Sequence, residues 1–205
     1  MNAHTEAAVV AGPAGAIECA IDHPAGTPRG VAVVCHPHPL HGGTMTNKVA
    51  QTLARALVQL GYRTVRFNFR GVGASAGSWD EGRGEVDDAR AVITAHRAAG
   101  EPLVLAGFSF GGSVASRAAA AVAEAGAPVQ RLVLVAPAVI NFPMAAVPDD
   151  TLLLHGETDD VVPLSAVMDW ARPTALPITV VPGVGHFFHG QLPRLKSLVL
   201  QGLAG

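Results

Sequence analysis

Residues 102–125, PLVLAGFSFGGSVASRAAAAVAEA, determine the fold class. The run from Leu103 to Ala106 has almost no polar residue, which is typical of a central strand in a parallel sheet. The stretch from Phe110 to Ala125 is rich in alanine and is followed by Gly126, so it predicts a helix with a glycine stop. Gly107-Phe108-Ser109-Phe110-Gly111 joins the two and fits G-x-S-x-G, a sharp strand-to-helix turn that exposes a serine above the sheet.

The same alternation of short apolar runs and longer helical stretches continues along the chain. It predicts a mostly parallel sheet with helices on both faces. Asn47 is expected to cap the first helix, which Gly61 ends. We expect strands at 7–11, 16–21, 31–35, 62–69, 103–106, 132–135, 151–154 and 178–181, and helices at 48–60, 85–98, 110–125, 165–172 and 191–203.

Composition limits the classes of protein and partner. The 205 residues, with no low-complexity linker or internal repeat, predict a single domain spanning residues 1–205. Hydrophobic residues make up 49% and charged residues 15%, which provides for a large core and excludes disorder as the main state. The net charge of −2, without a cluster of Lys or Arg, argues against nucleic acid and acidic membranes as partners.

The cysteines and the first residues of the chain predict the cellular compartment of the protein. Cys19 and Cys35 form no CxxC pair, and so few thiols favour a reducing compartment. The first residues lack a basic region before an apolar run, and no stretch approaches the roughly 18 apolar residues of a membrane span. We therefore expect a cytoplasmic protein that does not bind membranes.

The G-x-S-x-G pattern occurs twice, and the flanking sequence separates the two matches. Gly73-Ala74-Ser75-Ala76-Gly77 also fits, but it is followed by Gly77-Ser78-Trp79-Asp80, where no helix can begin directly. Ser109 has both the strand before it and the helix after it, which the exposed serine turn requires. Ser109 is therefore the predicted nucleophile.

The glycines at 71, 73 and 77 suggest an alternative, a dinucleotide-binding turn after a strand. That use needs a helix N-terminus directed at the pyrophosphate within the same turn. Here Asp80 and Glu81 intervene, and their carboxylates would repel phosphates. The nucleotide-binding interpretation is therefore disfavoured, and no cofactor is predicted.

A serine hydroxyl needs a base to take its proton, and the base needs an acid to orient it. Asp159 follows the strand expected at 151–154, and His186 follows the strand expected at 178–181, so both should emerge at one edge of the sheet. Spacing from the strand end favours Asp159 over Asp160. His155 is expected to pack beneath its loop, and His189 to cap the last helix or face solvent.

The loop His36-Pro37-His38-Pro39-Leu40-His41-Gly42-Gly43 raises the alternative of a zinc site. No carboxylate or cysteine follows nearby to complete the ligand set, so no metal is predicted. The loop is better interpreted as part of an oxyanion hole, which needs backbone N–H donors. Pro37 and Pro39 have no N–H, so His38 is the expected donor, together with Phe110 after the nucleophile.

With these residues identified, the chain resembles the α/β-hydrolase superfamily, in the compact lidless branch related to dienelactone hydrolases and small bacterial serine esterases. The resemblance covers nearly the whole chain through the motifs HPHPLHGG, RFNFRGVGASAG, GFSFGG, HGETDDVVP and GVGHFF. It implies a mostly parallel eight-stranded sheet, no lid domain, and the triad Ser109, Asp159 and His186. Dienelactone hydrolases use a cysteine nucleophile, so the serine here departs from their pattern.

The segment at 137–150, where relatives insert a lid, has the length of a plain loop. We expect its apolar side chains, Val139, Ile140, Phe142 and Met144, to line a shallow pocket. The predicted activity is hydrolysis of small-molecule carboxylic esters with short to medium acyl chains through an acyl-enzyme. A thioesterase, an amidase, a serine aminopeptidase-like hydrolase and a non-catalytic binding module remain alternatives. A homo-oligomer is left open, although nothing in the sequence indicates one.

Overall fold

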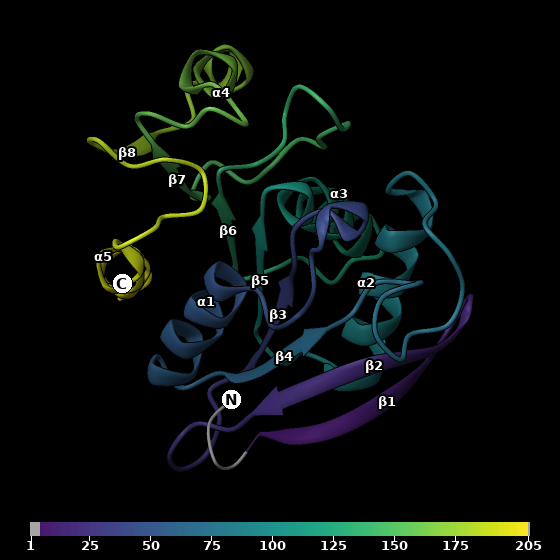
Figure 1. Cartoon of the computed structure of the whole chain (residues 1–205). Coiled ribbons are helices and arrows are strands. Elements are labelled where there is room, and N and C mark those ends of the chain that lie inside the picture. The colour runs from purple at the N-terminus through teal and green to yellow at the C-terminus, as the bar shows by residue number, and fades with distance from the viewer. Residues whose placement is uncertain (1–4, 205) are drawn as a thin grey trace.

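The chain forms an eight-stranded sheet in the order β1-β2-β4-β3-β5-β6-β7-β8 (Figure 1). The computed structural model describes residues 5–204. Pairs β1–β2 and β2–β4 are antiparallel and all others are parallel, which confirms the predicted mostly parallel sheet. The strands are β1 (Glu6–Gly12), β2 (Gly15–Asp22), β3 (Val31–Cys35), β4 (Arg63–Phe67), β5 (Leu103–Phe108), β6 (Arg131–Val135), β7 (Leu152–Gly156) and β8 (Ile178–Val181).

Helices cover both faces of the sheet, as predicted. One apolar layer joins the sheet to α1 and α5, and the other joins it to α2, α3 and α4 (Figure 1). The Asn47 side chain accepts from the N–H groups of Val49 and Ala50, so it caps α1 as expected. The helices are α1 (Lys48–Gln59), α2 (Arg83–His96), α3 (Phe110–Glu124), α4 (Leu164–Ala171) and α5 (Leu192–Gly202), with 3-10 turns η1 (Pro39–His41) and η2 (Arg172–Thr174).

Strand β3 shows why the central strands have almost no polar residue. Its side chains point alternately to the two faces of the sheet. Val31 and Val33 enter the layer beneath α2 and α3, whereas Ala32 and Val34 enter the layer beneath α1 and α5. Since both faces are covered, all of β3 is buried. The carboxyl ends of such strands are the rigid base on which the loops of the site stand.

The ends of the predicted strands and helices lie within two residues of the observed ends, and two of the differences have a polar cause. Strand β4 ends at Phe67 because the N–H of Phe69 donates to His36 Nε2 at 3.1 Å instead of to a neighbouring strand. Helix α2 begins at Arg83 because Glu85 is its third residue, where its carboxylate accepts the N–H of Gly82 at 2.8 Å. Side-chain hydrogen bonds of this kind override the local apolar pattern.

The connection from β6 to β7 contains no helix or strand, so the described chain has no lid domain. This agrees with the plain loop expected at 137–150. Within residues 5–204, each helix is too short or too polar to cross a bilayer.

Candidate active site

Ser109 occupies the sharp turn between β5 and α3. Its backbone has φ 55° and ψ −120°, a conformation that L-residues rarely adopt and that costs on the order of 1–3 kcal/mol. The strain is held by hydrogen bonds on both sides: the Ser109 N–H donates to Val135 O at 2.9 Å, and its carbonyl accepts from Gly112 N–H at 2.9 Å. The hydroxyl is thereby presented at the carboxyl end of the sheet.

The two glycines of the motif are required because the backbone passes too close for side chains. A Cβ on Gly107 would lie 2.1 Å from Gly111 O, and a Cβ on Gly111 would lie 2.2 Å from Cys35 O. Real contacts of this kind are never shorter than about 3 Å, so α3 packs against β5 and β3 only with glycine at both positions. The G-x-S-x-G pattern is therefore a steric consequence of this turn.

Ser109, His186 and Asp159 form one hydrogen-bonded chain, although they lie far apart in the sequence. His186 Nε2 lies 3.0 Å from Ser109 Oγ, and His186 Nδ1 lies 2.7 Å from Asp159 Oδ2. The three residues follow β5, β7 and β8, and each is almost fully buried. Because an ionised carboxylate only accepts, Nδ1 carries the proton and Nε2 is free to accept from the serine hydroxyl.

Asp159 is held as a carboxylate by its hydrogen bonds. Oδ1 accepts from Val161 N–H at 2.9 Å and from Val162 N–H at 2.7 Å, leaving Oδ2 for His186. Burial works to raise its pKa, but the hydrogen bonds from His186, Val162 and Val161 outweigh burial, so the pKa of Asp159 lies below its usual value. Asp160 is exposed, and the structure therefore brings Asp159, not Asp160, to the histidine.

The other two histidines of these loops lie where the sequence placed them. His155 is fully buried beneath its loop, with Nε2 donating to Val162 O at 2.9 Å and lying 3.5 Å from Asp159 Oδ2. Burial lowers its pKa, so it stays neutral beside the carboxylate. His189 is exposed, and its ring lies 5.7 Å from that of Phe187.

The histidines after β3 have separate structural settings. His36 is buried, donates from Nδ1 to Pro37 O at 2.7 Å and accepts at Nε2 from Phe69 N–H, so it ties β3 to the chain after β4. Burial lowers the pKa of His36 to about 4. The rings of His38 and His41 stack at 4.4 Å. Within residues 5–204, no group of three or more His, Cys, Asp or Glu side chains is arranged to hold a metal ion.

The two predicted oxyanion donors flank the serine. His38 lines the same small cavity as Ser109, and Phe110 is the next residue along the chain. Among the described residues, no acceptor takes the backbone N–H of either His38 or Phe110. Both donors are thus free to serve a ligand, and their role in an oxyanion hole stays a prediction.

The cavity at Ser109 differs from the predicted pocket. It measures about 90 Å³ and is lined by Ser109, His186, Asn47, Val161, Phe187 and parts of the 37–43 segment. The expected pocket residues after β6 do not line it. Phe142 packs on Phe110 with ring centroids 4.8 Å apart, and the Met144 sulfur contacts Ser116 Oγ at 3.9 Å. Val139 packs against the core, and Ile140 is exposed to solvent.

None of the four lines the cavity at Ser109, but Phe142 packs on His38, a wall residue of that cavity, with ring centroids 5.3 Å apart, so the apolar pocket stays a prediction. The sequence analysis also missed Asn47, Val161 and Phe187 as wall residues. Two of them could have been predicted from their closeness in sequence to the predicted triad, since Phe187 directly follows His186 and Val161 lies two residues after Asp159.

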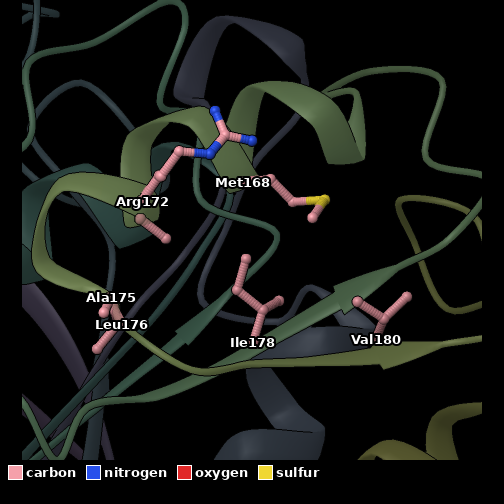
Figure 2. Close-up of a pocket in the computed structure, with 7 residues that line it drawn as sticks. Met168, Arg172, Ala175, Leu176, Ile178 and Val180 are labelled. Atoms are coloured by element: carbon pink, nitrogen blue, oxygen red, sulfur yellow. The ribbon is translucent and has the colours of Figure 1, made fainter.

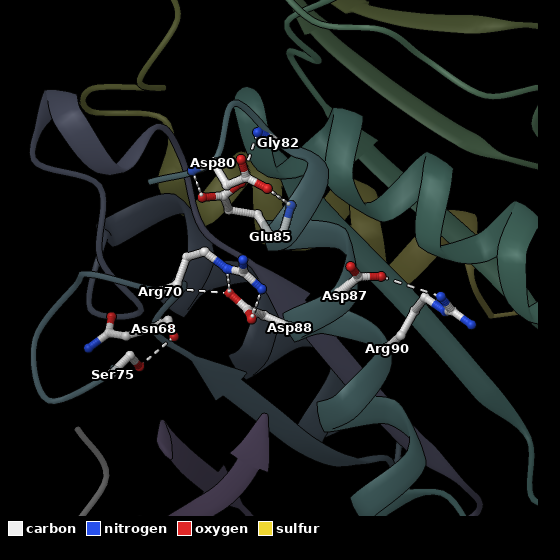
Figure 3. A network of polar contacts seen from close by, with 10 residues as sticks. Asn68, Arg70, Ser75, Asp80, Gly82, Glu85, Asp87, Asp88 and Arg90 are labelled. Atoms are coloured by element: carbon white, nitrogen blue, oxygen red, sulfur yellow. Dashed lines mark hydrogen bonds and ion pairs between the residues drawn. The ribbon is translucent and has the colours of Figure 1, made fainter. Parts of the chain in front are cut away.

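The second G-x-S-x-G match has a structural use. The Ser75 hydroxyl donates to Asn68 O at 2.7 Å and accepts from Glu18 N–H at 2.9 Å, so it fixes the glycine-rich loop after β4 (Figure 3). In the same loop, Arg70 donates three hydrogen bonds to the buried Asp88 carboxylate, one from its backbone N–H at 3.0 Å and two from its guanidinium at 3.0 and 2.8 Å (Figure 3). The glycine-rich segment is thus tied to β2 and α2.

A separate hollow lies between α4 and β8 (Figure 2). Met168, Leu176, Ile178 and Val180 give it an apolar lining, with Arg172 beside them. It holds none of the predicted site residues.

Comparisons with known proteins agree with this fold and this serine turn. A family model described as serine aminopeptidase, S33 (Hydrolase_4) matches residues 26–148. The protein RP471 of Rickettsia prowazekii is 31% identical, with 92% of this chain and 84% of that protein covered.

Two solved structures are similar over nearly the whole chain. XC6422 from Xanthomonas campestris, described as an α/β serine hydrolase without lid, is 39% identical with a TM-score of 0.89, covering 100% of this chain and 95% of that one. An α/β serine hydrolase homologue from Coxiella burnetii is 40% identical with a TM-score of 0.83, covering 97% of each chain. With Ser109 at a strained strand-to-helix turn and no lid over it, this chain belongs to the serine aminopeptidase S33 (Hydrolase_4) family, as a lidless member of the α/β serine hydrolases.

Proposed function

We propose that this protein hydrolyses carboxylic esters with short acyl groups, with Ser109 as nucleophile, His186 as base and Asp159 as orienting acid. The observation that carries the proposal is the continuous hydrogen-bonded chain from Ser109 Oγ through His186 to Asp159, with distances of 3.0 and 2.7 Å. A base within hydrogen-bond reach of the hydroxyl, itself oriented by a carboxylate, is what activates a serine.

In the proposed reaction, Ser109 Oγ attacks the ester carbonyl carbon while His186 Nε2 takes the hydroxyl proton. The carbonyl oxygen becomes an oxyanion that accepts from the N–H groups of His38 and Phe110. The intermediate collapses, the carbon–oxygen bond to the alcohol breaks, and His186 delivers its proton to the leaving oxygen. Water then attacks the acyl-serine while giving a proton to His186, which returns it to Ser109 as the acid leaves.

The size of the cavity at Ser109 favours a short acyl group. Its volume of about 90 Å³ equals that of about three water molecules, at about 30 Å³ each. An acetyl or propionyl group fits such a space, whereas a medium acyl chain must extend into solvent. The proposal therefore takes the short end of the range that the sequence suggested.

Charge at the site favours an ester over the substrate of an aminopeptidase. An aminopeptidase must bind a cationic amino terminus, which calls for a carboxylate in its substrate site. Among the described residues that line the cavity at Ser109 there is no Asp or Glu. Amino-acid nitroanilides should accordingly be cleaved much more slowly than nitrophenyl acetate.

The test is covalent labelling of the purified protein with a fluorophosphonate, beside Ser109→Ala and Ser75→Ala variants. Labelling should be lost in Ser109→Ala and retained in Ser75→Ala, with circular dichroism to verify that both variants fold. Turnover of nitrophenyl acetate should fall about a million-fold in Ser109→Ala, and turnover should decrease from acetate to octanoate esters. Labelling that survives Ser109→Ala would refute the proposal.

We also propose a cytoplasmic location. Both cysteines, Cys19 and Cys35, are buried free thiols, which suits a reducing compartment.

A further inference from the structure

We propose that a second cavity, which adjoins the one at Ser109, is a leaving-group subsite for alcohols that carry an anionic group. This inference rests on the proposed ester hydrolysis. The cavity measures about 370 Å³ and lies between the start of α1 and the segment that follows His186. Thr44, Thr46 and Lys48 line one side, and Phe187 and His189 line the other.

The two cavities are neighbours because they share wall residues. Asn47 and Phe187 line both of them. The Phe187 ring lies 5.0 Å from the ring of His186 and 5.7 Å from that of His189. It is 44% exposed, which is unusual for so large an apolar side chain and leaves one face available to an organic group. A molecule bound at Ser109 can thus continue over Phe187 into the second cavity.

The chemistry of the proposed reaction decides which part of the ester lies there. His186 Nε2 must deliver a proton to the leaving oxygen, so the alcohol leaves on the His186 side of the serine. Phe187 follows His186 directly and begins the second cavity. The cavity of about 90 Å³ holds only a short acyl group. The larger one therefore receives the alcohol part.

The charge of the second cavity selects the class of alcohol. Lys48 supplies an ammonium group, and among residues 5–204 it forms no ion pair. No Asp or Glu is among the described residues that line this cavity. Thr44 and Thr46, whose hydroxyls are 2.8 Å apart, add polar groups to the same wall. An unneutralised cation in a hollow attracts an anion, so carboxylate, phosphate or sulfonate groups on the alcohol are favoured.

A matched pair of acetate esters tests the subsite: 4-acetoxyphenylacetate, which carries a carboxylate, and 4-acetoxyphenylacetamide, which is neutral. The methylene spacer keeps the two phenols similar as leaving groups. We expect the protein to favour the carboxylate ester in kcat/KM by about threefold to fivefold at low salt, the range of a partly exposed ion pair. Added salt should reduce this preference.

Substitutions in α1 test whether Lys48 causes the preference for the carboxylate ester. Lys48→Met should bring the ratio of the two kcat/KM values close to one, and Lys48→Arg should keep it. Arg55→Met removes a charge from the same helix outside the cavity and should leave the ratio as in the wild type.

The possible failures are distinguishable. If wild-type protein cleaves both esters with equal kcat/KM and Ser109→Ala cleaves neither, the subsite is refuted and the proposed function stands. If Lys48→Met keeps the full preference, the assignment to this cavity is refuted. If no Ser109-dependent hydrolysis of either ester occurs, the proposed function fails and the subsite fails with it.

Discussion

Gly111 lies so close to Cys35 that a side chain at residue 111 would penetrate the backbone of the neighbouring strand: a Cβ there would be 2.2 Å from the Cys35 carbonyl oxygen. Helix α3 therefore starts in direct contact with the end of β3, which positions the serine turn beside the 37–43 segment.

Gly111→Ala should destabilise the protein. The added methyl group must push α3 away from β3, and overpacking of this kind costs about 1–3 kcal/mol in the free energy of unfolding. Urea unfolding followed by circular dichroism measures the loss. Ala123→Ser, which adds one atom at an exposed position of the same helix, is the control and should change stability by less than about 0.5 kcal/mol. Equal stability of Gly111→Ala and wild type would contradict the close contact.

Asp159→Asn should reduce turnover strongly, and Asp160→Asn should not. Without the carboxylate, the imidazole of His186 loses the group that fixes its tautomer, a change that lowers kcat by about 10⁴ in a serine protease. Asp160 is exposed, so its replacement should alter kcat by less than about twofold. The measurement is kcat for nitrophenyl acetate. Similar losses in both variants would refute the assignment of the acid.

Asp88→Asn should be far more destabilising than Asp87→Asn on the same helix. Asp88 is 1% exposed and accepts three hydrogen bonds from Arg70, whereas Asp87 is half exposed and pairs with Arg90 at 3.3 Å (Figure 3). Removing one partner of a buried ion pair costs about 3–5 kcal/mol, whereas an exposed pair contributes under about 1 kcal/mol. Urea unfolding of the two variants gives the comparison, and equal losses would contradict the buried pair.

His36 should make stability depend on pH. Burial lowers its pKa from 6.5 to about 4 in the folded protein. Between these values the unfolded chain binds a proton that the folded chain does not, so the free energy of unfolding decreases as the pH falls from 6.5 toward 4. This residue accounts for up to about 3 kcal/mol of that decrease.

The variant His36→Gln keeps an acceptor for the N–H of Phe69 and removes the titration. Urea unfolding at about pH 7 and about pH 5 should therefore show a smaller difference in this variant than in the wild type. An unchanged pH dependence in His36→Gln would contradict the lowered pKa.

Two strands have the predicted limits at both ends. Val31–Cys35 and Ile178–Val181 begin and end as expected, because Gly30 and His36 bound the first run and Pro177 and Pro182 bound the second. The positions of Asp159 and His186 beside Ser109 followed from the same rule, since groups after parallel strands meet at one edge. Element ends set by side-chain hydrogen bonds, such as that of His36 to Phe69, were not predicted.

The residues that line the cavity at Ser109 could not be predicted from the sequence, because they depend on where the loops bend. Nothing in the composition of the segment after β6 distinguishes packing on α3 from packing over Ser109. In the structure the segment packs on α3 through Met144 and Phe142, and Phe142 also contacts His38 in the wall of the Ser109 cavity. The order of the strands, with β4 between β2 and β3, is likewise a property of the whole sheet, since no local sequence pattern specifies which strands become neighbours.

The plain loop between β6 and β7 has a consequence for the fate of the acylated serine. The described chain has no lid domain over the site, so in the proposed reaction water has a direct path from solvent to the acyl group on Ser109. Water at its full concentration then outcompetes dilute alcohols or amines as the final acceptor. We therefore expect the acyl group in the proposed reaction to be released to water and not transferred to a second alcohol or amine.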